Sequence, residues 1–269
     1  MLPIVVLACY LASAVWLASS AYRAGDSAAR GSRAAGLALG VVALIAHAFL
    51  LQRSVFAQQA LSFGVAEAAS LMSWPTGAIA LGLAWRRPRF AAVAAVIAAA
   101  AGVAALLGVE GDTGFAIGRH NWEVAAHIVL SAVAYAVLSI AVVLAIALAL
   151  LDRRLRRRQP LGWLTILPSV EALENGAFEA LATGFALLTL ALFSGFIFVE
   201  DLFAQHLIHK TVLSCLAWLV FAILLFGRWR FGWRGRTATS WTLSGFALLA
   251  LAYFGSKIVL ETILGRHWG

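Results

Sequence analysis

The chain has 269 residues, of which 63% are hydrophobic and only 12% are charged, and its formal net charge is +8. A soluble globular domain carries about twice that share of charged residues, so a soluble fold is excluded. The apolar runs are continuous rather than alternating, which argues against a membrane β-barrel, and we expect an all-α, polytopic transmembrane helix bundle.

Eight apolar stretches are long enough to cross a hydrocarbon core of about 30 Å. Their ranges in chain order are 2–22, 34–52, 65–85, 90–109, 124–150, 180–199, 211–227 and 239–263. We expect them to form a single integral membrane domain over residues 1–269. Trp74-Pro75 should interrupt the third span, because proline removes a backbone donor and kinks a helix. The first stretch has no positively charged start, so we interpret it as a retained helix rather than a signal peptide.

Basic residues gather in alternate connections between these spans. Fifteen of the 20 lysines and arginines follow spans one, three, five and seven. The other five are Arg53, Arg119, Lys210, Lys257 and Arg266. By the positive-inside rule the crowded side is cytoplasmic, and an even number of spans then puts both termini outside. The positive charge therefore indicates topology and contact with membrane lipids, and not nucleic-acid binding.

The longest connection, residues 151–179, is the segment with the most soluble character. It opens with the arginine run LDRRLRRRQP, which we interpret as a stop-transfer anchor. Ser169, Glu171 and Glu174 are typical of the start of an amphipathic helix at the membrane surface. A second arginine cluster, GRWRFGWRGRTATSW, interleaves aromatic residues and favours an interfacial aromatic belt.

Several common motifs are missing from the sequence. Cys9 and Cys215 lie in different predicted spans, with no C-x-x-C pair, no haem-attachment C-x-x-C-H and no zinc-ligand spacing. No G-x-x-x-x-G-K-[ST] phosphate loop occurs either. We therefore expect neither thiol-redox chemistry nor ATP hydrolysis by this chain.

Histidines are the polar residues that most need a reason in so apolar a chain. His47 lies inside the second span, His127 near the outer end of the fifth, and His206 and His209 at the outer mouth of the seventh, so all four share a similar depth. Intramembrane ionisable groups are costly and tend to face the bundle interior, and neutral imidazole is a common axial ligand of haem iron. A hydrogen bond to a neighbouring helix is the alternative for each of them.

Lys210 and Lys257 are the two lysines of the chain, whereas arginine is used throughout the basic side. Each lysine either caps the membrane surface by snorkelling or counters an anionic ligand group such as a carboxylate. Glu200, Asp201 and Glu261 are near enough in sequence to neutralise them instead.

Three stretches occur in an order that resembles a known family. They are SVEALENGAFEALATGFALLTLALFSGFIF, EDLFAQHLIHKTVLSCLAWLVFAILL and GWRGRTATSWTLSGFALLALAYFGSK, and the upstream HIVLSAVAYAVLSIAVVLAIAL fits the same pattern. Together they resemble the cytochrome c assembly protein family, the CcsA-like group of polytopic haem-handling proteins. The likeness is strongest over residues 123–258, and it is nearest to the eight-helix inner-membrane branch of the YpjD and HemX type.

The resemblance implies a bacterial inner-membrane protein with an assembly-type core over residues 34–263, haem (heme) as cofactor and cytochrome c maturation proteins as partners. Family members hold haem at the outer face between paired histidines, beside a tryptophan-rich segment. His127 matches a ligand-bearing position, and Lys210 and Thr211 fall near the lysine and threonine of that segment. It thus implies His127 and His209 as metal ligands and His47 and Lys210 as further cofactor-binding residues. His267 lies roughly where a second outer histidine stands.

The tryptophan-rich segment is replaced here by AQHLIHKTVLSCLAW, which lacks the porphyrin platform. We therefore expect a haem carrier, chaperone or accessory protein of cytochrome c-type biogenesis and not an enzyme. One alternative is a regulatory or scaffolding membrane protein without haem that binds a cytosolic partner through residues 151–179. A transporter is a weaker alternative, because no symmetry-related pair of broken helices occurs.

Overall fold

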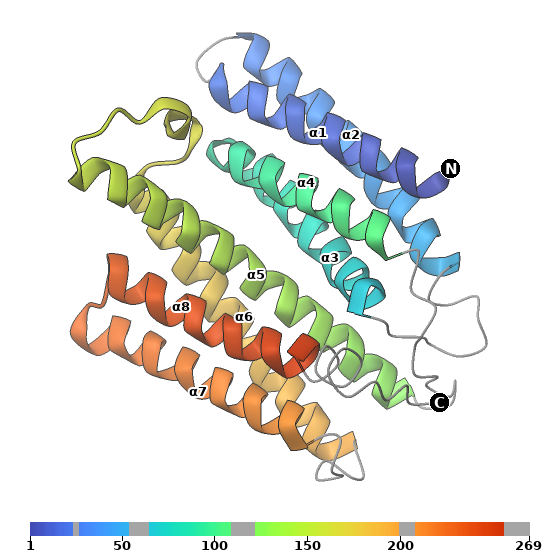
Figure 1. Ribbon diagram of the computed structural model, residues 1–269, viewed down its shortest axis with the longest axis vertical. Helices are drawn as coiled ribbons and strands as arrows, with labels where there is room; N and C mark the ends of the chain where they lie inside the picture. The colour runs from blue at the N-terminus through green and yellow to red at the C-terminus, as the bar shows by residue number, and fades with distance from the viewer. Residues whose placement is uncertain (24–26, 54–64, 109–121, 199–207, 256–269) are drawn as a thin grey trace. The chain divides into compact units, whose positions relative to one another are not determined.

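A computed structural model of the chain describes residues 1–23, 27–53, 65–108, 122–198 and 208–255. Its regular structure over these ranges is helical throughout, with no strand, which confirms the all-α prediction. The same ranges contain eight α-helices (Figure 1). They are α1 Leu2–Tyr22, α2 Ser27–Leu51, α3 Val65–Arg86, α4 Ala91–Leu107, α5 Trp122–Arg156, α6 Val170–Phe198, α7 Ile208–Phe231 and α8 Gly235–Ala250.

Seven helical segments of the described ranges are long and apolar enough to cross a membrane. They are Leu2–Tyr22, Ala28–Leu51, Pro88–Leu107, Ala126–Arg156, Val170–Ile197, Lys210–Phe231 and Gly235–Gly255. Helix α3 has 22 residues but is less apolar, because it contains Glu67, Ser70 and Ser73. The side chains of Glu67 and Ser70 are turned inward, being only 4% and 2% exposed. The chain is a polytopic membrane protein of about eight helices, and the outward orientation of its termini stays a prediction.

Pro75 lies inside α3, which runs as one helix from Val65 to Arg86, so the span is not interrupted there, and the predicted kink stays a prediction. Side chains beside the proline bind backbone carbonyls and fix this part of the helix. The hydroxyl of Thr76 donates to the carbonyl of Met72 at 2.7 Å. The indole of Trp74 donates to the carbonyl of Leu44 on α2 at 2.9 Å, which ties the two helices together.

The connection predicted over residues 151–179 is largely helical. Helix α5 continues to Arg156, where arginines in its last turn interact favourably with the helix dipole. Helix α6 begins at Val170 with Glu171 in its first turn, so the helix start predicted at Ser169 is confirmed. That start belongs to the membrane-crossing helix itself, because α6 runs from Val170 to Phe198 as one continuous helix.

The chain divides into two compact units. The first, Met1–Arg119 with Arg157–Ser169, contains α1 to α4 and two short 3₁₀ helices, η2 Pro88–Phe90 and η3 Gly162–Ile166. The second, His120–Arg156 with Val170–Gly269, contains α5 to α8 and a π-helix, η4 Leu251–Gly255. Their union in one domain over residues 1–269 stays a prediction.

In the first unit α1 packs against α2 and α4, and α3 packs against α4. Small residues let these backbones approach closely, as is usual between membrane helices. A Cβ added at Gly102 of α4 would stand 2.9 Å from the Cβ of Tyr10 on α1. The fully or nearly buried core of this unit is Val6, Tyr10, Ala43, Leu50, Ala98, Ala101 and Ala105.

In the second unit α5 packs against α6 and α8, and α7 packs against α8 and α6. Glycines again stand at the tightest crossings. A Cβ at Gly184 of α6 would come within 2.7 Å of the side chain of Leu138 on α5, and a Cβ at Gly245 of α8 within 2.5 Å of the Phe221 ring on α7. The buried core is Ala134, Leu138, Ala141, Leu181, Leu188, Ala217, Phe221, Leu224, Ala238 and Leu249.

The turn between α7 and α8 is held by a carboxylate from α6. Oxygen Oε1 of Glu174, whose side chain is mostly buried, accepts a hydrogen bond from Arg228 at 2.7 Å and lies 3.1 Å from Nε of Arg234. Gly232 in this turn has φ +65°, a conformation that side chains rarely adopt. The Trp233 ring folds over α7 and packs against Trp241 of α8 at 5.5 Å. Two guanidinium groups on one carboxylate thus fix this turn to the start of α6.

Candidate functional site

His127 lies in the second turn of α5, half-buried against α6. Its Nδ1 is 2.8 Å from the hydroxyl oxygen of Ser194 on α6. That hydroxyl donates to the carbonyl of Ala191, also at 2.8 Å. A serine hydroxyl has a single proton, so toward the imidazole it can only accept. Nδ1 of His127 therefore carries the proton, and Nε2 carries a free lone pair.

The imidazole of His127 rests on Gly195. A Cβ built on that glycine would stand 3.1 Å from Cε1 of the ring, which is tighter than ordinary contact. Within the part of the chain that the structure describes, Nε2 has no hydrogen-bond partner. Ser194 and Gly195 thus orient the ring and leave one nitrogen able to bind a metal or accept a proton.

Helices α5 and α7 begin at the same end of the second unit, where α6 and α8 end (Figure 1). His209 is in the first turn of α7, so its backbone lies at the same end as His127. The side chain of His209 and the whole of His206 lie outside the described residues. Lys210 is exposed on α7 and has an interaction partner in the structure.

His47 of α2 has a different environment, in the first unit. It is fully buried, and both of its ring nitrogens are bonded inside the protein. Nδ1 is 3.2 Å from the hydroxyl of Tyr10 on α1, and Nε2 is 3.0 Å from the hydroxyl of Ser70 on α3. The His47 ring therefore links three helices, and binding iron would cost it one of these hydrogen bonds. Its convergence with His127 on one pocket stays a prediction.

No group of three or more histidine, cysteine, aspartate or glutamate side chains that could hold a metal ion occurs among the described residues. The donor set at the described end of α5 is one oriented imidazole. One imidazole with a free nitrogen can serve as a ligand of an iron whose other positions are filled by the four nitrogens of a porphyrin.

Comparison with known proteins identifies the family, since residues 38–264 match the family described as cytochrome C assembly protein. The chain belongs to the cytochrome c assembly protein family.

Inner membrane protein YpjD of Escherichia coli strain K12 is 39% identical to the chain over 137 residues, which are 51% of this chain and 52% of that protein. A protein described as an uncharacterized 28.8 kDa protein of Azospirillum brasilense is 34% identical over 141 residues, 52% of each chain. Cytochrome c biogenesis protein CcsA of Microcystis aeruginosa is 27% identical over 104 residues, 38% of this chain and 32% of CcsA. The aligned part spans about half the length, or less, of these curated relatives. No solved structure matches the chain.

The cytochrome c assembly family and the YpjD relative establish a multi-pass protein of the bacterial inner membrane. The tryptophan that remains in AQHLIHKTVLSCLAW is Trp218, and it packs inside the second unit. Its ring stacks on Phe185 of α6 with centroids 5.4 Å apart, and its indole donates to the hydroxyl of Thr189 at 2.9 Å. Trp218 therefore serves helix packing in this family member.

Sequence reasoning found His127 but missed the two residues that orient it. Ser194 and Gly195 stand next to each other in an apolar run, and only the serine interrupts its hydrophobicity. The π-helix η4 at the end of α8 was also missed. It places the ring of Phe254 with its centroid 6.1 Å from that of Tyr135. Tyr135 lies on α5 about two turns after His127. π-Helical turns are frequent at functional sites. The AYFGSK stretch was the sequence signal that could have drawn attention to this turn.

Proposed function

We propose that this chain is a haem-handling protein of cytochrome c biogenesis, in which His127, through its Nε2, and His209 would hold the haem iron. The observation that carries the proposal is the hydrogen bond between Nδ1 of His127 and the hydroxyl of Ser194, which leaves Nε2 as the nitrogen with the lone pair. Membership of the cytochrome c assembly family supports the biological context. The name of the CcsA relative, cytochrome c biogenesis protein, points the same way.

The protein's part in this function is to bind and orient. Metal-binding histidines nearly always donate their second N–H to an acceptor that fixes the ring, and Ser194 is that acceptor for His127. Gly195 keeps the space beside the ring free of a side chain. When bound, haem would supply an iron centre that takes imidazole nitrogens at its axial positions. Lys210 is the residue proposed to pair with a propionate.

A carrier or accessory role is proposed in preference to a stand-alone synthase. The segment AQHLIHKTVLSCLAW lacks the family's tryptophan platform, and its tryptophan, Trp218, is committed to packing against α6. Attachment of haem to a protein requires a C-x-x-C-H partner that this chain does not itself contain. Other cytochrome c maturation proteins are the proposed partners.

Hemin titration of the purified full chain in detergent tests the proposal. The wild-type protein is expected to give a saturable Soret band at one hemin per chain. His127→Gly should reduce this band strongly, and added imidazole should restore it, because the small molecule can occupy the vacated ligand position. Imidazole rescue separates the loss of a ligand from a loss of fold.

The matched control is His120→Gly, at a histidine outside the predicted spans. This variant should bind hemin with the same Soret amplitude and midpoint as the wild type. A Soret band of the same amplitude and midpoint in His127→Gly, without imidazole, would overturn the proposal for this residue. Failure of the wild-type chain to bind hemin would overturn the haem-handling function itself.

A further inference from the structure

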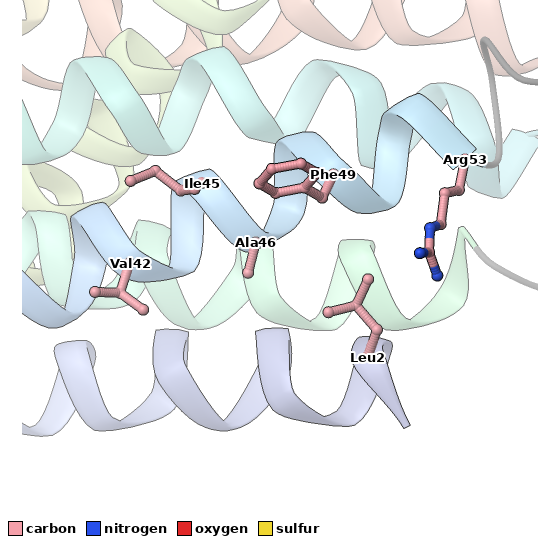
Figure 2. Close-up of a pocket in the computed structure, with 6 residues that line it drawn as sticks. All are labelled: Leu2, Val42, Ile45, Ala46, Phe49 and Arg53. Atoms are coloured by element: carbon pink, nitrogen blue, oxygen red, sulfur yellow. The ribbon is translucent and has the colours of Figure 1, made fainter.

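A hollow of about 570 Å³ lies in the first unit beside α1 and α2. It is lined by Leu2 from α1 and by Val42, Ile45, Ala46 and Phe49 from α2, with Arg53 just beyond α2 (Figure 2). The volume is within the range of small-molecule sites, which is roughly 300–1,000 Å³. Val42, Ile45 and Phe49 are each more than half exposed, so the hollow opens on the outside of this unit.

The lining residues of the hollow extend along α2 over about the depth of one bilayer leaflet. Val42 of α2 and Arg53 just beyond it are eleven residues apart in sequence, and at 1.5 Å per residue this corresponds to about 16 Å along the helix direction. That distance is about half of the roughly 30 Å hydrocarbon core. Val42 is near the middle of the predicted crossing Ala28–Leu51, so Arg53 lies close to the membrane boundary.

Arg53 gives this apolar hollow a charge at one end only. The remaining lining residues are aliphatic or aromatic. Within the described ranges, Arg53 forms no ion pair with an acidic side chain. An elongated apolar surface that ends in a guanidinium with no acidic partner among the described residues complements an amphiphile with a negative head and a hydrocarbon chain about one leaflet long.

We propose that this hollow binds a phospholipid with an anionic headgroup, its phosphate on Arg53 and one acyl chain along Val42, Ala46 and Phe49. A second copy of the protein is a poorer occupant. A dimer built on this face, with its two-fold axis along the membrane normal, would bring a second Arg53 to the same depth, and the two charges would repel. The site is separate from the haem proposal, since none of the hollow's lining residues belongs to the proposed ligand set.

Native mass spectrometry of the full chain released from nanodiscs tests this site. Nanodiscs containing equal amounts of phosphatidylglycerol and phosphatidylcholine should yield protein that retains phosphatidylglycerol preferentially. Arg53→Gln should weaken this retention about fivefold, from the roughly 1 kcal/mol that one basic residue gains near an anionic surface. Arg53→Lys should keep most of it. Arg230→Gln, at an arginine remote in sequence and in the second unit, is the charge-matched control.

Ala46→Phe tests the apolar part of the same site, because the added ring would fill the hollow beside Phe49. It should lower phosphatidylglycerol retention, whereas Val41→Phe, on an exposed position of α2 outside the lining, should not. Equal retention by the wild type, Arg53→Gln and Ala46→Phe would overturn the proposal. If the wild type forms a lipid-free dimer that Ala46→Phe dissociates, the occupant of the hollow is a second copy of the protein and not a lipid. If Arg53→Gln loses retention but Ala46→Phe does not, the lipid contacts the protein through its headgroup only, and the acyl-chain part of the proposal is overturned.

Discussion

His127 on α5 and Ser194 on α6 are joined by a hydrogen bond of 2.8 Å between the imidazole Nδ1 and the hydroxyl oxygen. Because Ser194 gives its own proton to the carbonyl of Ala191, this bond runs from the histidine to the serine. The pair therefore does more than join two helices. It fixes which nitrogen of His127 holds a lone pair, and the proposed role of His127 depends on this choice.

Removing the serine hydroxyl should weaken haem binding without unfolding the protein. We expect Ser194→Ala to lower hemin affinity about tenfold or more, the usual effect of losing the partner that orients a metal-binding histidine. Ser194→Thr, which keeps a hydroxyl, should retain most of the affinity. Ser139→Ala removes a comparable hydroxyl whose hydrogen bond among the described residues is to the carbonyl of Tyr135, and it should have no effect. Hemin titration is the measurement, and equal affinities for Ser194→Ala and the wild type would contradict the prediction.

A methyl group on Gly195 should displace the His127 ring. The added Cβ would stand 3.1 Å from Cε1, so the imidazole must move by a few tenths of an ångström or more. We expect Gly195→Ala to weaken hemin binding and to shift the Soret maximum. Gly82→Ala is the matched control, because nothing lies within 4 Å of its Cβ, and in a helix interior alanine is favoured over glycine by roughly 1 kcal/mol. An unchanged spectrum and affinity for Gly195→Ala would show that the ring does not need this space.

Replacing His47 should mainly lower stability, whereas replacing His127 should mainly lower haem binding. His47→Ala leaves the hydroxyls of Tyr10 and Ser70 buried without their partner, which should cost on the order of 3 kcal/mol of unfolding free energy. His127→Ala should cost less, because that ring is half-buried and makes one described hydrogen bond. Thermal unfolding and hemin titration of both variants in detergent are the measurements. If His47→Ala loses the Soret band while its unfolding midpoint stays unchanged, His47 is a ligand and not a structural link.

The carboxylate of Glu174 should stabilise the second unit through its two arginines. We expect Glu174→Gln to lower the free energy of unfolding by about 1–3 kcal/mol, since the mostly buried pair with Arg228 loses its charge. The matched control is Asp152→Asn, which breaks the exposed pair with Arg156 on α5, and such surface pairs contribute about 0.5 kcal/mol or less. Denaturant unfolding of both variants measures the difference. Equal destabilisation would mean that Glu174 does not hold the α7–α8 turn.

Hydrophobicity and charge placement were enough to predict that the helices exist, but they did not predict most of the contacts that form the candidate site. Apolar runs locate membrane helices because each must cover the hydrocarbon core, so α1 and α4 were predicted within a few residues. The start of α6 was predicted at Ser169, but the glutamates of its first turns were interpreted as a surface segment and the sixth span was predicted to begin only at residue 180. Nothing in the sequence shows that Arg228 neutralises Glu174.

The histidines show the same limit. His127 was found because an ionisable group in an apolar run is costly, whereas Ser194 is small and neutral and gives no such signal. The bond between them joins residues 67 positions apart, so it depends on how α5 packs against α6. Sequence also could not distinguish His127 from His47, whose nitrogens are both occupied by Tyr10 and Ser70.

Electron paramagnetic resonance of the ferric hemin complex tests the central claim most directly, because the spin state of the iron reports its axial ligands. For the wild-type chain we predict the low-spin spectrum of two imidazole ligands. His127→Ala and His209→Ala should each convert it to a high-spin spectrum, and exogenous imidazole should restore the low-spin signal in both. A low-spin spectrum that survives His127→Ala unchanged, without added imidazole, would contradict the account.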